Sequence, residues 1–172
     1  MIIAITGLPG TGKSTLARQL AKALHARVLD KDHIRAALFG FEGTTYTRGQ
    51  DDFVVGIIYR TTARLLAEDP TRTVILDGRT YSQTYQVEAV RRLATSLRQP
   101  LKIIECRCDD TTARNRLRRD RTADNHPAAN RDPSLHSTLK AQAHPIPGPK
   151  LVIDTNKPQS EVLHACLDYL SN

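Results

Sequence analysis

One short segment constrains the fold of this chain more than any other, and it reads Gly7-Leu8-Pro9-Gly10-Thr11-Gly12-Lys13-Ser14. It matches the phosphate-binding pattern G-x-x-x-x-G-K-[ST] at every fixed position. An apolar run precedes it, and apolar residues at helical spacing follow it. In that context the glycines let backbone N–H groups converge on phosphate oxygens, and the start of the helix adds a favourable dipole. We therefore predict a nucleotide-binding loop formed by Gly7, Pro9, Gly10, Thr11, Gly12, Lys13, Ser14 and Thr15.

Short apolar runs bounded by turn residues recur along the chain, at residues 2–6, 27–30, 73–77, 101–107 and 151–154. They are continuous rather than alternating, as expected for strands that are covered on both faces. Segments with helical spacing lie between them, and this alternation predicts a parallel sheet with right-handed crossovers. We expect an α/β fold in which helices sandwich a five-stranded parallel sheet, within a single domain of residues 1–172.

Two segments interrupt the alternation of strands and helices. Five of the nine prolines fall between residues 122 and 149. We predict that residues 119–149 form an inserted lid, with one short helix near residues 135–142. Residues 41–50 contain two glycines and three threonines, and we expect them to form a loop on the substrate side.

Length and composition bound the class of protein. A chain of 172 residues buries enough surface to fold without disulfides or zinc. Its net charge of +7 attracts anions, which leaves nucleic acid, nucleotides and phosphorylated metabolites open as partners. No apolar run is long enough to span a bilayer, and the N-terminus lacks the pattern of a signal peptide, so we expect a cytoplasmic protein without a membrane partner. Cys106 and Cys108 lie two apart in an apolar run, which predicts buried packing residues on one strand face rather than a metal site.

Several classes of phosphate-loop protein are disfavoured by what the sequence lacks. A GTPase needs an N-K-x-D motif, and the nearest stretch, Asn156-Lys157-Pro158-Gln159, lacks the acid. No stretch resembles the L-S-G-G-Q signature of transporter ATPases, and the chain is too short for the helical lid domain of hexameric ATPases. Small kinases remain.

Residues 28–35 read Val-Leu-Asp-Lys-Asp-His-Ile-Arg and follow the second predicted strand. This stretch resembles the P-loop kinases that phosphorylate hydroxyl groups, namely the adenylylsulfate-kinase-like and polynucleotide-kinase-like (zeta-toxin-like) group. The resemblance implies a fold like that of the nucleoside monophosphate kinases, with a lid. It also implies that Asp32 orients or deprotonates the acceptor hydroxyl and that Arg35 holds an anionic part of the acceptor. Capping of the next helix is the alternative role, and it explains Asp30 well.

The third predicted strand ends in Asp77, where the magnesium-binding aspartate of such proteins belongs. We expect Ser14 and Asp77 to hold Mg²⁺, Asp77 either directly or through water, while Lys13 bridges the β- and γ-phosphates. A strand-ending turn is the alternative for Asp77. Resemblance to nucleoside monophosphate kinases implies that Arg79 contacts the acceptor, and loop position places Tyr81 in the acceptor pocket, together with Tyr46, Arg48 and Tyr85.

Five arginines cluster after the fourth predicted strand. On a helix, Arg114, Arg118 and Arg121 share a face, whereas Arg116 and Arg119 point elsewhere. Small P-loop kinases place lid arginines here, and polynucleotide kinases show a matching R-x-x-x-R. The resemblance therefore implies that Arg114 and Arg118 bind ATP and that Arg118 stabilises the transferring phosphoryl group. A solvated basic helix and a nucleic-acid surface are the alternatives, the latter without aromatic residues nearby for base stacking.

Together these features predict an ATP- and Mg²⁺-dependent kinase that phosphorylates a hydroxyl group of a small molecule. A polynucleotide kinase acting on a 5′-hydroxyl end, an adenylylsulfate kinase and a nucleotide-binding module without catalysis are the alternatives. The segment after Asp77 lacks a counterpart of the adenylylsulfate kinase substrate loop, and the proline-rich lid departs from polynucleotide kinases. The sequence leaves the acceptor, the preference for ATP over GTP and the oligomeric state open.

Overall fold

The computed structural model describes residues 1–122 and 133–172. Strands and helices alternate along most of the chain, in the order β1 (Ile2–Thr6), α1 (Lys13–Leu24), β2 (Arg27–Asp30), α2 (Lys31–Phe39), α3 (Arg48–Glu68), β3 (Val74–Asp77), α4 (Thr84–Ser96), β4 (Leu101–Arg107), α5 (Asp110–Thr122), α6 (Pro133–Gln142), β5 (Leu151–Asp154) and α7 (Gln159–Ser171).

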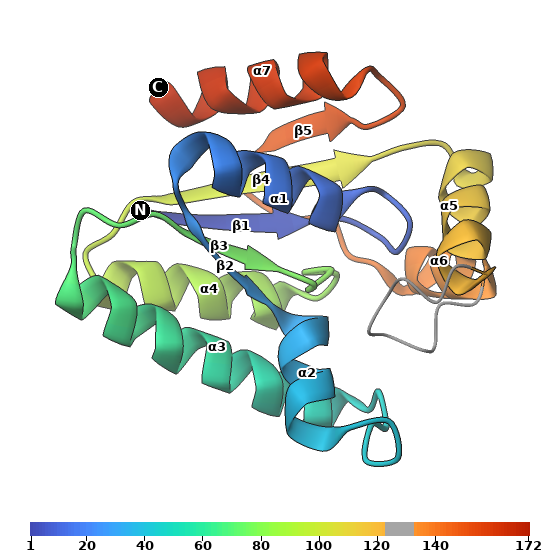
Figure 1. Ribbon diagram of the computed structural model, residues 1–172, viewed down its shortest axis with the longest axis horizontal. Helices are drawn as coiled ribbons and strands as arrows, with labels where there is room; N and C mark the ends of the chain where they lie inside the picture. The colour runs from blue at the N-terminus through green and yellow to red at the C-terminus, as the bar shows by residue number, and fades with distance from the viewer. Residues whose placement is uncertain (123–132) are drawn as a thin grey trace.

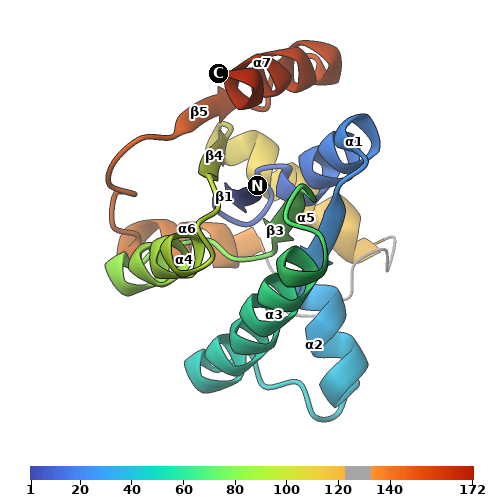
Figure 2. The same cartoon turned by 90° about the vertical axis from the view of Figure 1, so that its left-hand side faces the viewer.

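The strands form one parallel sheet in the order β2-β3-β1-β4-β5. This confirms the predicted α/β fold, and four of the five strands have the predicted bounds. The third strand begins at Val74, one residue later than expected. Helices α1 and α7 cover one face of the sheet, and α3 and α4 cover the other (Figures 1 and 2).

The central strand β1 shows why its apolar run is continuous. Ile2 and Ala4 pack into the core beneath α3 and α4, whereas Ile3 and Ile5 pack into the core beneath α1 and α7. Successive side chains of a strand point to opposite faces, so a strand between two helix layers needs apolar residues at every position. All five residues of β1 are buried.

The carboxyl ends of the parallel strands meet at one edge of the sheet, where ligands bind in open α/β folds. The loop after β1, the start of α2 after β2 and the turn after β3 all lie at this edge. Helices α5 and α6 lie beyond the same edge (Figure 1). The topology therefore collects the candidate residues of the first three strand ends beside α5, which leads into the predicted lid, and α6, which lies within it.

The connections at this edge differ in part from the sequence-based expectation. Helix α3 begins at Arg48, and the Thr47 hydroxyl accepts a hydrogen bond from the Gln50 N–H. The irregular segment expected over residues 41–50 is therefore shorter. Cys106 is buried in β4, but Cys108 lies beyond the end of the strand and is half-buried, so the two do not share a strand face. Among the described residues, no helix is long and apolar enough to cross a membrane.

Candidate active site

The loop between β1 and α1 depends on glycine at three positions with positive φ. Gly7, Gly10 and Gly12 have φ values of 137°, 80° and 84°. A Cβ atom on Gly7 would lie 2.4 Å from the Cys106 carbonyl oxygen, and one on Gly10 would lie 2.4 Å from the Ala113 carbonyl oxygen. Glycine is therefore needed here both for backbone conformation and for close packing against β4 and α5.

Lys13 begins α1 and is buried under the loop, with 7% of its surface exposed. Its ammonium group donates a hydrogen bond to the Leu8 carbonyl oxygen at 2.9 Å. The lysine thus lies along the inner side of the loop, where the positive end of the helix dipole adds to its charge. An anion held by this loop would meet backbone N–H groups, the helix N-terminus and a cation.

Asp77, at the end of β3, is buried beside Ser14. Burial and the neighbouring Asp30 carboxylate raise the pKa of Asp77, whereas the nearby Ser14 hydroxyl and the Lys13 charge act in the opposite direction. Asp30 pairs with Asp77 across β2 and β3. A hydroxyl and carboxylates are the oxygen ligands that Mg²⁺ takes in proteins. The donor set of Ser14 and Asp77 therefore fits a magnesium ion.

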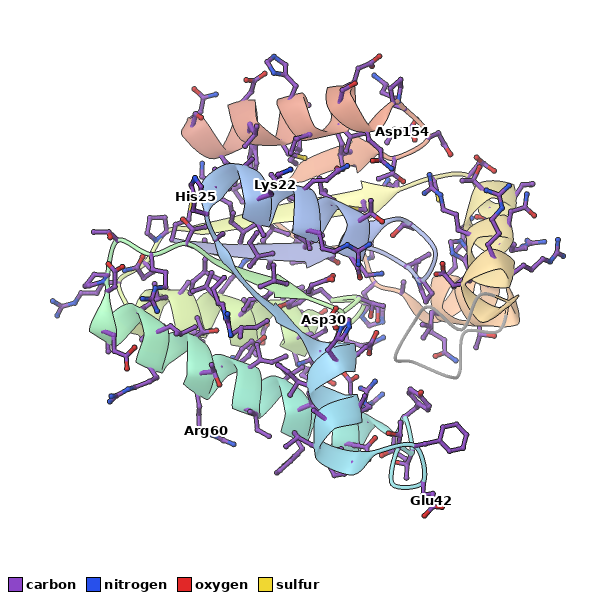
Figure 3. The ribbon with its side chains drawn as sticks, viewed as in Figure 1. Lys22, His25, Asp30, Glu42, Arg60 and Asp154 are labelled. Carbon is purple, nitrogen blue, oxygen red and sulfur yellow. The ribbon has the colours of Figure 1, made fainter. Side chains whose placement is uncertain are left out.

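Asp30 also caps helix α2, as the sequence allowed. Its Oδ1 accepts hydrogen bonds from the N–H groups of Asp32 and His33, at 2.8 and 3.1 Å. Figure 3 shows Asp30 where β2 passes into α2. The cap fixes the first turn of α2, which carries Asp32.

Asp32 and Arg35 belong to a buried charge network between α2 and α3. Arg35 has 4% of its side chain exposed, and its guanidinium donates to Asp32 Oδ1 at 3.0 Å and to Asp51 Oδ1 at 2.5 Å. Lys31 donates to the same Asp51 oxygen at 2.5 Å. The second oxygen of Asp32 accepts no hydrogen bond from the part of the chain that the structure describes. Asp32 therefore keeps one carboxylate oxygen for a ligand, whereas both terminal nitrogens of Arg35 are engaged.

Asp51 has a pKa that reflects this network. Burial acts to raise the pKa, but the charges of Lys31, Arg79 and Arg35 outweigh it, and the pKa lies below the ordinary value of 3.8. A carboxylate whose pKa is lower in the folded state stabilises the fold above its unfolded pKa, and this contribution disappears as the pH falls through the folded pKa.

We therefore expect Asp51→Asn to lose less thermal stability than the wild type between about pH 5 and pH 3. The variant is less stable at pH 7, because Lys31 and Arg35 then lack their shared carboxylate. Thermal unfolding followed by circular dichroism at several pH values measures the difference. Asp168→Asn, which changes an exposed carboxylate on α7, is the matched control. Parallel pH profiles for Asp51→Asn and the wild type would contradict the assignment.

Two cavities meet at the phosphate-binding loop. The first, of about 410 Å³, lies between α1 and the end of β5 and is named the α1 cavity. The second, of about 270 Å³, lies over the start of α2 and α3 and is named the α2 cavity. Lys13 and Ser14 line both cavities, and Asp32 and Arg35 line only the α2 cavity. A group bound at Lys13 is therefore accessible from two sides.

The residues expected to form an acceptor pocket divide into two sets. Tyr46, Arg48 and Tyr85 line the α2 cavity. Arg79 and Tyr81 do not. Arg79 is buried, with an ion pair to Asp52 at 2.5 Å, and its guanidinium lies over the Tyr85 ring.

Tyr81 is buried in the core, close to Tyr59, whose buried hydroxyl has no hydrogen-bond partner among the described residues. Burial raises the pKa of Tyr81 well above its ordinary value. It also lines a separate cavity on the far side of the loop, beside His136. Arg79 and Tyr81 thus support the walls around the α2 cavity rather than line it.

On α5, the arginine that contacts the loop is not one of those expected. Arg116 donates to the Gly10 carbonyl oxygen at 3.5 Å, to the Thr155 hydroxyl at 3.1 Å and to the Thr155 carbonyl oxygen at 2.8 Å. It lines the α1 cavity, contrary to the expectation that it points elsewhere. Arg114 and Arg118 lie on the exposed part of α5, and their roles stay predictions. The side chain of Arg121 lies outside the described residues.

Helix α6 is joined to the loop by a histidine that belongs to none of the sequence motifs described above. His136 is buried, with Nδ1 2.8 Å from the Pro9 carbonyl oxygen and Nε2 3.2 Å from Asp110 Oδ1. Two other residues of α6, Leu139 and Gln142, line the α2 cavity. His126 lies outside the described residues. Helix α5 therefore borders the α1 cavity, α6 borders the α2 cavity, and both helices also border the separate cavity on the far side of the loop.

Comparison with known proteins agrees with this geometry. The AAA domain family model matches residues 2–144. No curated protein sequence matches the chain. Among solved structures, a Chloroflexus aurantiacus protein provisionally described as a kinase superposes with a TM-score of 0.79 and 23% identity, over 99% of this chain and 96% of that one.

Two further structures have named ligands or activities. A Sinorhizobium meliloti gluconokinase superposes with a TM-score of 0.72 and 17% identity, over 98% of this chain and 90% of that one. The adenylylsulfate (APS) kinase of Mycobacterium tuberculosis, in complex with AMPPNP and APS, gives a TM-score of 0.69 and 18% identity, over 99% and 97% of the two chains. These likenesses establish the P-loop kinase-like fold and leave the acceptor open.

Proposed function

This chain belongs to the AAA domain family, and from that premise we propose that it is an ATP-dependent kinase that transfers the γ-phosphoryl group to a hydroxyl group of a small molecule. The proposal depends on one observation above all. Lys13 and Ser14 lie between two cavities, and the α2 cavity is lined by Asp32, one carboxylate oxygen of which accepts no hydrogen bond from the described residues. Phosphoryl transfer needs this arrangement, because donor and acceptor must approach the phosphorus atom from opposite sides.

The nucleotide would occupy the α1 cavity, with its phosphates in the loop over residues 7–15. The base of the nucleotide would lie toward Arg116 and Thr155. Ser14 and Asp77 would hold Mg²⁺, which neutralises phosphate charge and orients the γ-phosphoryl group when it is bound. Lys13 would contact the β- and γ-phosphates and stabilise the negative charge that spreads during transfer.

The acceptor would occupy the α2 cavity with one hydroxyl group beside Asp32. The hydroxyl oxygen forms a bond to the γ-phosphorus while the bond from that phosphorus to the β,γ-bridging oxygen breaks, and ADP leaves. The hydroxyl proton passes to the free oxygen of Asp32 and then to solvent. An alcohol is a weak nucleophile, so a carboxylate within about 3 Å favours the step.

Helices α5 and α6 would close the site. Arg116 on α5 borders the nucleotide side, and Leu139 and Gln142 on α6 border the acceptor side. A lid over residues 119–149 that closes when both ligands are bound would exclude water, which otherwise competes with the acceptor for the γ-phosphoryl group. Arg114 and Arg118, on α5 just before this lid, would act on the bound nucleotide.

Arg116→Ala is expected to raise the KM for ATP about tenfold, because hydrogen bonds to a charged group are worth about 1.5–3 kcal/mol each. Its three contacts link the loop to the end of β5 beside the nucleotide. Steady-state kinetics with ATP varied at saturating acceptor measures the change. Arg119→Ala, which removes an exposed arginine from the same helix, is the control. Equal effects of the two changes would exclude a specific role for Arg116.

The experiment that tests the proposed function measures acceptor-dependent ADP release across a panel of hydroxyl compounds. The panel holds sugars, nucleosides, amino alcohols, adenylylsulfate and a 5′-hydroxyl oligonucleotide, and products are identified as phosphate monoesters by mass spectrometry. Turnover with a small molecule supports the proposal. Turnover only with the oligonucleotide, weakening steeply with salt, would make this a polynucleotide kinase instead. ATP binding without turnover on any alcohol would favour a nucleotide-binding module.

A further inference from the structure

The α2 cavity is rich in charged side chains, yet those charges are already neutralised within the protein. Arg35 is paired with Asp32 and with Asp51, and Lys31 is paired with Asp51. Two cations therefore face two carboxylates at the base of the cavity. Sequence resemblance implied that Arg35 binds an anionic part of the acceptor, but both of its terminal nitrogens already contact carboxylates, and only its buried Nε has no acceptor among the described residues. A phosphate, sulfate or carboxylate group entering here would compete with carboxylates of the protein for the same two cations.

The remaining cations of the cavity do not change this balance. Lys13 lies at the phosphate-binding loop, where it would contact the phosphates of the proposed nucleotide. Arg48 is exposed at the start of α3, so water already solvates its charge and an ion pair there contributes little. The face of Arg35 is covered in addition by the Tyr46 ring, with 5.3 Å from the guanidinium carbon to the ring centre.

Neutral hydrogen-bonding groups supply much of the remaining lining, beside Pro9, Gly78 and Leu139. Thr80, Ser82, Gln83 and Gln86 contribute hydroxyl and amide groups. Gln86 is buried, and its amide oxygen has no donor among the described residues. A hydroxyl group can donate to such an oxygen and can also accept, whereas an ionised acid can only accept. Asp32 likewise has an oxygen that requires a donor.

We propose that the acceptor of the α2 cavity is an uncharged polyhydroxy compound rather than an acid, a phosphate ester or an amine. This inference rests on the proposed function for the location of the acceptor. Its physical basis is that a buried charge costs free energy unless a partner of opposite charge is available, and here each buried charge already has one. A charged ligand is therefore disfavoured because it would leave charged groups unpaired in the cavity, and not only because a neutral ligand makes favourable contacts there.

Matched ligands test the inference by binding, independently of turnover. Glucose, gluconate, glucose 6-phosphate and glucosamine form one series, and glycerol, glycerate and glycerol 3-phosphate form another. Isothermal calorimetry measures their affinity for the full chain saturated with a non-hydrolysable ATP analogue. We expect a neutral member to bind at least about tenfold more tightly than its charged counterparts.

A charged member that binds as tightly as its neutral counterpart would overturn the inference, and so would the failure of every neutral polyol to bind at millimolar concentration. Neutral binding without phosphorylation would uphold the inference while the proposed function fails. The two proposals thus fail by different results.

A pair of variants provides a second test through the charge network itself. Asp51→Asn removes the carboxylate shared by Lys31 and Arg35 and should open an anion site, so that sulfate competes with the neutral ligand about tenfold more strongly than in the wild type. Asp52→Asn makes the same change one residue along, but its partner Arg79 does not line the cavity, and sulfate competition should stay as in the wild type. Equal sulfate sensitivity of the two variants would contradict the inference. If Asp51→Asn does not fold, the matched ligands on the wild type decide alone.

Discussion

Asp32→Asn is expected to lower kcat about 10²- to 10⁴-fold, which is the usual contribution of a positioned general base. The change keeps the shape of the side chain but removes its negative charge, and with it the ability to take a proton. Because Asp32 lines the α2 cavity and not the α1 cavity, the affinity for ATP should change little. Single-turnover measurement of product formation separates the chemical step from binding.

Loss of the Asp32–Arg35 ion pair is the competing explanation for such a decrease, and Arg35→Gln tests it. That variant breaks the same ion pair but leaves the carboxylate in place. A base at Asp32 predicts a far larger decrease in kcat for Asp32→Asn than for Arg35→Gln. Similar decreases in both variants, or an Asp32→Asn enzyme within about threefold of the wild type, would show that Asp32 only positions its neighbours.

The parts of the molecule that follow from local sequence pattern could be predicted. A strand buried on both faces is apolar over most of its length, so β1 was identifiable from the run Ile2–Thr6, in which only the last residue is polar. The three glycines with positive φ and the lysine that follows them form a contiguous motif, and the rule that parallel strands end at one edge brought Asp32 and Asp77 to the same site. These inferences needed only neighbouring residues and the alternation of strands and helices.

The orientation of α5 shows where local pattern is insufficient. Ala113 and Leu117 are buried and mark the inner face of the helix. At 3.6 residues per turn, Arg114 and Arg116 flank that face at similar angles, so the apolar pair could not decide between them. The contact of Gly10 with the Ala113 carbonyl oxygen, more than a hundred residues along the chain, determines that Arg116 faces the loop.

The pairing of charges in the α2 cavity also depends on tertiary packing. Asp51 lies in the first turn of α3, where an acid is explained by the helix dipole alone. Only the packing of α2 against α3 brings it to Lys31 and Arg35. His136 is a similar case, because its buried contact with the Pro9 carbonyl oxygen joins residues 127 positions apart. No spacing rule within a helix or strand reports such contacts.

Lys13→Ala is expected to lower kcat about 10²- to 10³-fold, which is the usual effect of removing one preorganised group that stabilises transition-state charge. Its ammonium group donates a hydrogen bond to the Leu8 carbonyl oxygen. Losing that hydrogen bond costs only about 1 kcal/mol, so the variant should fold. Lys22→Ala is the matched control, since Lys22 is exposed in the last turn of the same helix, away from both cavities (Figure 3).

Comparison of Lys13→Ala with Asp32→Asn separates the hydrolysis of ATP by water from phosphoryl transfer to the acceptor. Because Lys13 lines both cavities and Asp32 lines only one, Lys13→Ala should also slow the hydrolysis of ATP by water, whereas Asp32→Asn should spare it. Measurement of ADP release with and without acceptor in both variants makes the distinction. If Lys13→Ala retained transfer to the acceptor at the level of Lys22→Ala, the loop would not hold the reacting phosphate, and the transfer site would have to lie elsewhere in the molecule.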